Sequence, residues 1–232
     1  MEHSDDITAM AMSSDGKTVA TGEIGPKPLI CIWDAVTMKP LHCLKGKLTK
    51  GIQGLSFSPS GNTLAAVAID NDHHVGLFDV KTGAPRGISK NDGNRVLDIA
   101  MKSDSEFVSV GLKHFKTWTL NSGALQSKRG LFGKYDNRVL CCEFAGDMCI
   151  AGTLGGSILV WNSNSVSNHI QGTHTRPVDA IHVNKNFVFT GSRDGTVVIL
   201  SIQKKLSEVM KFSMADEQFG SVDPGLNAFC LH

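Results

Sequence analysis

The chain has 232 residues, of which 41% are hydrophobic, so it is long enough and apolar enough to fold around a packed core. Its 23 Lys and Arg side chains nearly balance its 22 Asp and Glu side chains, and the formal net charge is +1. This balance argues against binding to nucleic acid or to a membrane surface through bulk charge.

The sequence also lacks the segments that direct a chain to a membrane. No apolar run approaches the roughly 18 residues that a membrane-spanning helix needs. The acidic residues 1–6 resemble neither a signal peptide nor a transit peptide. The 6 cysteines form no CxxC pair and no metal-like spacing with histidine, so we expect free, mostly buried thiols and no metal site. These features predict a cytoplasmic chain.

A unit of four segments recurs along the chain. It consists of an apolar strand, a second strand ending in a small residue plus Gly, a third strand ending in an aromatic residue, and a polar fourth segment. The first copy starts at residues 7–12, turns at 14–17, and continues to Thr21 and Trp33. The residue near the end of the third strand is the landmark of each copy, and it is Trp33 in the first copy. In the later copies it is Phe78, Trp118, Trp161 and Leu200. The steps between successive landmarks are 45, 40, 43 and 39 residues.

A period of about 40–45 residues with four strands in each unit is typical of β-propellers. One four-stranded sheet cannot bury both of its faces alone, whereas sheets stacked around an axis cover one another. We therefore predict an all-β propeller with an incomplete ring. Its five four-stranded blades are expected at approximately 5–46, 50–92, 94–134, 137–172 and 176–213, followed by the first strand of a sixth at 219–232.

The ends of several third strands resemble those of WD repeats, in which a polar network joins His, Ser or Thr, Asp and Trp within a blade. The first blade has an insertion at 25–28 where the Asp belongs, and the fifth has Leu200 in place of Trp. The residues expected to serve as structural WD positions are His3, Thr21, Trp33, Asp34, Phe78, Asp79, Trp118, Trp161, His174, Thr190 and Asp194.

The sequence between the repeats is similar to that of one WD subfamily, the echinoderm microtubule-associated protein-like family. The segments that carry the resemblance are 3–7, 20–23, 32–37, 113–120 and 127–135, and the similarity continues to about 221. The resemblance implies a cytoskeletal protein whose propeller contacts tubulin. Members of the family also carry an upstream hydrophobic motif and two joined propellers. We therefore expect the remaining blades of a longer parent protein to close the ring.

Three features that suggest chemistry have simpler explanations. The glycine-rich stretch 152–156 lies between two predicted strands with no helix after it, which favours a tight turn over a phosphate loop. Neither His73 with His74 nor Cys141 with Cys142 is suited to joint chemistry, because adjacent strand residues point to opposite faces. A loop is the better placement for the two histidines. We predict a non-catalytic chain that needs no cofactor.

A basic residue lies in the loop before the first strand of four blades: Lys50, Arg95, Arg138 and Arg176. Such loops share one rim of a propeller, so we expect an arc of positive charge that suits an acidic protein surface. The alternative is ordinary solvated loop charge without a partner. A second candidate comprises Lys128, Arg129 and Lys134 on an expected connector between blades, where an exposed bend without a partner is the alternative.

Two classes of function stay open. The first is a non-catalytic binding module of a microtubule-associated protein, with tubulin or microtubules as its partner. The second is a generic WD-repeat scaffold for signalling or ubiquitin-ligase complexes, because a fold does not fix a function. Neither class involves nucleic acid or a membrane.

Overall fold

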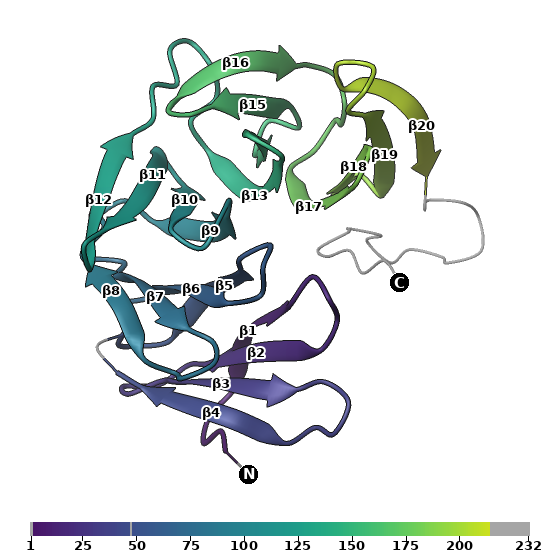
Figure 1. The fold of residues 1–232 in the computed structure, drawn as a ribbon. Helices are drawn as coiled ribbons and strands as arrows, with labels where there is room; N and C mark the ends of the chain where they lie inside the picture. Colours follow the sequence, from purple (N-terminus) through teal and green to yellow (C-terminus); the bar gives the residue numbers. More distant parts are fainter. Residues whose placement is uncertain (1, 47, 214–232) are drawn as a thin grey trace. The chain divides into compact units, whose positions relative to one another are not determined.

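The computed structural model describes residues 2–46 and 48–213, and within them the chain forms twenty strands and no helix (Figure 1). The strands make five four-stranded antiparallel sheets, which confirms the predicted all-β fold and the five blades. The first strand of a sixth blade, expected at 219–232, lies outside the described residues.

Each sheet is a simple meander, in which strands consecutive in sequence are neighbours. The first two sheets contain β1 (Ile7–Met12), β2 (Thr18–Glu23), β3 (Leu29–Asp34) and β4 (Pro40–Lys45), then β5 (Ile52–Phe57), β6 (Thr63–Ala68), β7 (Val75–Asp79) and β8 (Pro85–Ser89). The third contains β9 (Val96–Met101), β10 (Glu106–Gly111), β11 (His114–Asn121) and β12 (Ala124–Arg129). The last two contain β13 (Val139–Ala145), β14 (Met148–Thr153), β15 (Ile158–Asn162) and β16 (Ser165–Ile170), then β17 (Val178–Asn184), β18 (Phe187–Ser192), β19 (Thr196–Ser201) and β20 (Ser207–Ser213).

The burial of each strand follows its position in the sheet. All six residues of β6, a central strand, are buried, and its sequence is a continuous run of small and apolar side chains. The outermost strands β12 and β20 are almost entirely exposed; β12 carries mostly polar and charged residues, whereas β20 also exposes Val209, Met210 and Phe212. An apolar central strand needs cover on both faces, whereas an outermost strand needs little.

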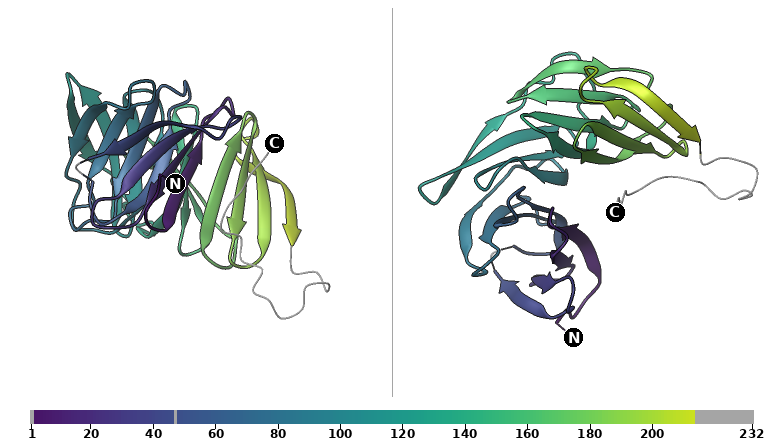
Figure 2. Two further views of the ribbon diagram at one scale, coloured as in Figure 1. Left: turned by 90° about the horizontal axis from the view of Figure 1, so that it is seen from below. Right: turned by 45° about the vertical axis from the view of Figure 1, so that its right-hand side comes forward.

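Irregularities in the pairing recur at the same places in the repeats. The first strand shifts register between Ile7 and Ala9 in the first blade, and between Ile52 and Gly54 in the second. A further shift separates Ile32 from Trp33, and the same shift separates Val160 from Trp161 in the fourth blade. Such bulges bend a strand and increase its twist, which is visible in each sheet (Figure 2).

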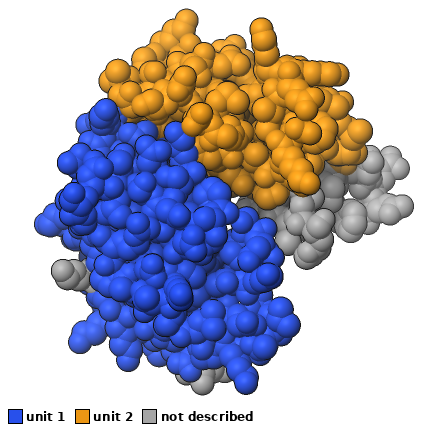
Figure 3. Space-filling model, viewed as in Figure 1, with its two compact units in different colours: residues 1–109, 116–129 blue, residues 110–115, 130–232 orange. Residues whose placement is uncertain are grey.

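The chain divides into two compact units (Figure 3). The first comprises residues 1–109 and 116–129, and the second comprises 110–115 and 130–232. In the first unit one apolar cluster joins the first and second blades, and another joins the second and third. In the second unit an apolar cluster joins the fourth and fifth blades. The cores therefore lie between neighbouring sheets, as expected for stacked blades.

The Gly-terminated second strands approach the next blade closely. A Cβ atom added to Gly22 would lie 2.6 Å from the Cβ of Ile52 on the next blade. In the second unit, a Cβ on Gly152 would lie 2.8 Å from Val178. Only glycine permits this spacing between adjacent blades.

Candidate functional site

The loops before the innermost strands place two basic residues of the first unit at the same end of adjacent blades. Strands β5 and β9 lie side by side and run parallel, since Gly54 faces Ile99 and Ser56 accepts a hydrogen bond from the amide of Met101. Lys50 lies two residues before β5 and Arg95 one residue before β9, and both side chains are exposed.

The backbone at Lys50 is held by the preceding blade. Lys50 has a left-handed φ of 67°, and its carbonyl accepts a hydrogen bond of 3.4 Å from the amide of Gly25. Gly51 forms a bridge with Ile24, and the Lys50 Nζ donates to Asn71 Oδ1 at 2.6 Å. This loop therefore presents its charge from a fixed position.

In the second unit, Arg138 and Arg176 lie in the equivalent loops before β13 and β17. Arg138 makes a bidentate pair with Asp136, in which Nε lies 2.9 Å from Oδ1 and Nη2 lies 3.1 Å from Oδ2. Burial favours a raised pKa for Asp136, but hydrogen bonds from Arg138 and the amide of Gly155 outweigh it and lower the pKa. This carboxylate offsets part of the positive charge predicted at Arg138.

Arg176 is oriented by the neighbouring turn of its own blade. Its Nη1 donates to the carbonyl of Arg193 at 3.1 Å, and Arg193 in turn makes a bidentate pair with Asp179. The Arg193 amide donates to the Pro177 carbonyl, so the loop and the turn are joined in both directions.

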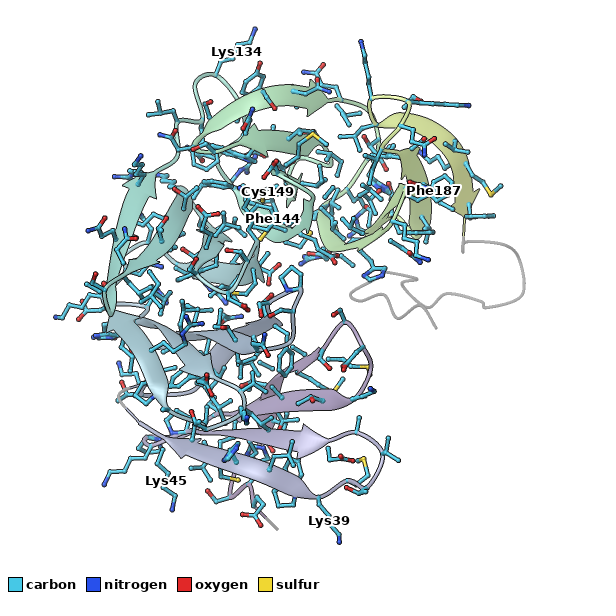
Figure 4. All side chains as sticks on the ribbon, viewed as in Figure 1. Lys39, Lys45, Lys134, Phe144, Cys149 and Phe187 are labelled. Atoms are coloured by element: carbon cyan, nitrogen blue, oxygen red, sulfur yellow. The ribbon has the colours of Figure 1, made fainter. Side chains whose placement is uncertain are left out.

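The second basic candidate is only partly where the sequence placed it. Lys128 and Arg129 belong to β12, where they pair with Thr117 and Lys116, so the expectation that they lie on a connector was wrong. The pairing of β12 with β11 continues to Arg129, because β11 is long enough to supply a partner for each of these residues. Lys134 does lie in the connector, and its side chain points away from the sheets (Figure 4).

The polar network of the first blade is complete, because Glu23 replaces the Asp that the sequence lacks. Trp33 Nε1 donates to Thr21 Oγ1 at 2.7 Å, and His3 Nε2 lies 2.7 Å from the same oxygen. His3 Nδ1 lies 2.9 Å from Glu23 Oε2 and must be the donor, since a carboxylate only accepts. Glu23 is 2% exposed and also accepts from the amides of Ser4 and Leu29.

The network of the fifth blade is built on the predicted residues. His174 Nε2 lies 2.8 Å from Thr190 Oγ1, and its Nδ1 lies 2.6 Å from the hydroxyl of Thr196. Asp194 accepts hydrogen bonds from the amides and hydroxyls of Thr175 and Thr196. Burial of Asp194 opposes its ionisation, but these bonds outweigh burial and hold its pKa below the usual range. Burial lowers the pKa of His174.

The second and third blades use other polar residues. Trp118 Nε1 donates to Ser109 Oγ at 2.9 Å, and Asn91 Nδ2 donates to the same oxygen at 3.3 Å, so Asn91 serves where His3 serves in the first blade. In the second blade, Phe78 is buried and Asp70 pairs with His74 at 3.0 Å. His73 and His74 precede β7, which confirms their placement in a loop.

Asp34 and Asp79 stabilise the turns that follow the third strands. Asp34 Oδ1 accepts from the amides of Val36 and Thr37, and Asp79 Oδ1 accepts from the amide and hydroxyl of Thr82. These bonds are typical of Asx turns, in which a side chain satisfies backbone donors two or three residues ahead. The two residues therefore have a local structural role.

Trp161 is held by rings and has no polar network. Its side chain is fully buried, stacks on Phe115 with a centroid distance of 3.7 Å, and meets the edge of Phe132 at 4.9 Å. Its indole N–H has no hydrogen-bond partner among the described residues. A Cβ on Gly130 would lie 2.9 Å from this ring. Gly130 and Phe132 belong to 127–135, one of the stretches behind the family resemblance, and both lie against Trp161.

Sequence reasoning missed Glu23 and Asn91. Glu23 follows Thr21-Gly22 directly, and a charged residue at the end of an otherwise buried strand was the available signal. Asn91 lies in a polar loop and carried no signal of its own. Over residues 2–46 and 48–213, no group of three His, Cys, Asp or Glu side chains is arranged to hold a metal ion, and no helix could cross a membrane. Residues 152–153 end β14 and residues 154–157 form the turn to β15, so the predicted tight turn is confirmed.

Comparison with known protein families decides the identity. The family model described as the echinoderm microtubule-associated protein first beta-propeller matches residues 1–225. The chain belongs to this family. The resemblance seen between the repeats is confirmed, and so are the WD-repeat and propeller assignments that it carried.

Individual relatives agree with the family. The chain is 32% identical to echinoderm microtubule-associated protein-like 2 of Mus musculus, across 95% of this chain and 36% of that protein. It is 30% identical to the ciliary WD repeat-containing protein ctxp80 of Euplotoides octocarinatus, across 86% and 29%. It is 29% identical to the 77 kDa echinoderm microtubule-associated protein of Strongylocentrotus purpuratus, across 92% and 34%. The chain thus spans about a third of the length of these curated relatives.

A solved structure confirms the fold. The β-propeller domain of Cps50 (Swd1) from Myceliophteria thermophila superposes with a TM-score of 0.72 at 14% identity, over 86% of this chain and 67% of that one. At this identity the likeness concerns the fold alone.

Proposed function

We propose that this chain is a non-catalytic, protein-binding propeller segment that contacts tubulin or microtubules through the basic loops before its innermost strands. The observation that carries the proposal is the placement of Lys50 and Arg95 at one end of adjacent blades, with the backbone of Lys50 fixed by the preceding blade. Arg138 and Arg176 occupy the equivalent loops of the second unit.

The relatives support this choice of partner. Several carry "microtubule-associated" in their names, and this chain shares their first propeller. Tubulin is acidic, so exposed cations on a fixed backbone suit it electrostatically. Association with microtubules would place the chain in the cytoplasm with the cytoskeleton.

The test replaces both cations of the first unit. The double variant Lys50→Glu, Arg95→Glu changes the charge by four units, and the matched control Lys17→Glu, Lys39→Glu makes the same change at exposed lysines in other turns. Binding is measured by co-sedimentation with microtubules and by pulldown of soluble tubulin. We expect at least tenfold weaker binding for the double variant and a change of less than twofold for the control.

Two results would contradict the proposal. An equal loss of binding in both variants would mean that binding depends on bulk charge. Unchanged binding in a folded double variant would mean that these loops do not contact tubulin. Circular dichroism of both variants checks that the sheets remain intact.

A further inference from the structure

A groove of about 600 Å³ lies between the outer strands of the first two blades, within the first unit. Strand β4 of the first blade and strand β8 of the second form its walls, and the turn at Gly123 in the third blade contributes at one end. Its volume falls within the range of about 300–1,000 Å³ that is usual for binding sites. The groove is separate from the loops assigned to tubulin contact.

The floor of the groove is apolar. Leu44 and Phe78 are core residues that also line it, and Ile88 and Pro85 extend the apolar surface along β8. Gly83 has a φ of 72°, and a Cβ there would lie 2.9 Å from Leu44, which keeps the two blades close beneath the groove. An aliphatic side chain entering the groove would find a preformed apolar contact.

The formally charged side chains that line this floor are positive. His42, Lys45 and Arg86 line the groove, and none of the described lining residues is Asp or Glu. Arg86 is positioned by hydrogen bonds from Nη1 to the Thr63 hydroxyl and to the Asp104 carbonyl at 2.9 Å. His42 Nε2 lies 2.8 Å from the Lys81 carbonyl, and Lys45 is exposed at the end of β4 (Figure 4).

Both walls are strands at the edge of their sheets. The order β1-β2-β3-β4 leaves the outer side of β4 without a sheet neighbour, and the order β5-β6-β7-β8 does the same for β8. Edge strands present backbone donors and acceptors that an extended peptide can use. Gly46, directly after β4, has open space where a Cβ would lie, so no side chain there keeps such a backbone away.

We propose that this groove binds a short, extended, acidic peptide segment of a partner protein, with carboxylates paired to Lys45 and Arg86 and one aliphatic side chain on Leu44 and Phe78. Charge complementarity selects an acidic segment, the apolar floor selects a peptide that also carries an aliphatic residue, and the strand edges select an extended backbone. This second contact surface does not depend on the basic loops.

The test uses a fluorescent ten-residue peptide that alternates Glu with Ile or Val. Binding to the whole chain is followed by fluorescence anisotropy at 50 mM and 300 mM salt. Gly46→Glu blocks the groove without backbone strain, because no atom lies within 4 Å of an added Cβ and its φ is not left-handed. Gly93→Glu is its matched control, since Gly93 has the same open surroundings and does not line the groove.

A second pair of variants tests charge alone. Lys45→Glu reverses a lining charge, whereas Lys39→Glu reverses an exposed charge at the other end of β4 (Figure 4). We expect micromolar binding that weakens at least fivefold in Gly46→Glu and in Lys45→Glu. Both controls should stay within twofold, and binding should fall at 300 mM salt because exposed ion pairs are screened.

Other outcomes overturn the proposal. If a peptide with Gln in place of Glu binds equally well, the carboxylates do not contribute to binding. If a Glu-only peptide or an oligophosphate of equal charge binds equally well, the apolar floor does not contribute to binding. Equal losses in the lining and control variants would show binding elsewhere. If Gly46→Glu does not fold, the Lys45 and Lys39 pair alone decides.

Discussion

The first and fourth blades each have a tryptophan at the equivalent position, but different interactions hold the two side chains in place. Trp33 and Trp161 occupy equivalent places, each following a bulge in the third strand. Trp33 donates its indole N–H to Thr21, whereas Trp161 is more deeply buried and its N–H has no partner among the described residues. The register is the same in both blades, since Thr21 faces Cys31 in the first and Ala151 faces Leu159 in the fourth, so the difference is that Ala151 supplies no hydroxyl.

This comparison separates what makes a blade from what stabilises it. Both blades keep the bulges, and both keep the glycine that lets the next blade approach closely, Gly22 in one and Gly152 in the other. The hydroxyl that accepts from the indole is present in the first blade and absent from the described residues around Trp161 in the fourth. Stacking on Phe115 takes the place of that hydrogen bond in the fourth blade. Blade geometry therefore survives the loss of the polar network.

The largest expected effect comes from removing the carboxylate of the first blade. Glu23→Ala leaves the amides of Ser4 and Leu29 and His3 Nδ1 without their acceptor in a buried place. Each such buried group costs about 1–3 kcal/mol. We expect the free energy of unfolding of the first unit to fall by about 3 kcal/mol in total, measured by urea denaturation and by hydrogen exchange of β1 and β2.

The control is Glu2→Ala, which removes an exposed carboxylate from the same N-terminal segment. It should change stability by less than about 0.5 kcal/mol. A Glu23→Ala protein as stable as this control would show that the network of the first blade contributes little.

A smaller effect distinguishes the first blade from the fifth. Thr21→Val removes the acceptor of the Trp33 indole and the contact with His3, and we expect a loss of about 2 kcal/mol. Thr190→Val removes the contact with His174 but no indole bond, because Leu200 replaces the tryptophan, so a loss of about 1 kcal/mol is expected. Hydrogen exchange within each blade measures both losses, and a reversed order would contradict the assignment of the indole bond.

The fifth blade should respond to acid in two stages. Burial lowers the pKa of His174, so the folded chain binds its proton less readily than the unfolded chain, and stability falls as the pH drops below about 6.5. The pKa of Asp194 is also lowered, so its contribution is retained until the pH falls below about 4. The slope of the first stage is at most about 1.4 kcal/mol per pH unit.

His174→Gln tests this assignment because glutamine bonds to both threonines without titrating. Thermal unfolding between pH 7 and 5 should lose the destabilisation that His174 contributes, while the acid stage below about pH 4 should persist. The control is His169→Gln, which changes a half-buried histidine outside the network and should leave the slope unaltered.

The features that recur in every blade could be predicted from the sequence. The residues that replace the usual members of the polar network in a single blade could not. Landmark spacing and strand patterning located the first three strands of every blade, because every blade solves the same burial problem. The polar fourth strands were harder to place, and β12 includes Lys128 and Arg129, which were expected on a connector. Glu23 escaped prediction because a longer side chain reaches the same ring from a different position. The pairing of Arg138 with Asp136 depends on the loop conformation, which no periodic pattern specifies.

The smallest expected effect is a gain of stability. Ala151→Ser places a hydroxyl where Thr21 lies in the first blade, within reach of the unpartnered Trp161 indole. We expect about 1 kcal/mol of added stability and slower exchange of the indole proton. Ala66→Ser is the matched control, because Ala66 holds the same register opposite Gly76 and its blade has Phe78, which cannot donate. It should lose about 1 kcal/mol. Equal losses in both variants would mean that packing against Phe115, and not the missing acceptor, determines how the fourth blade holds its tryptophan.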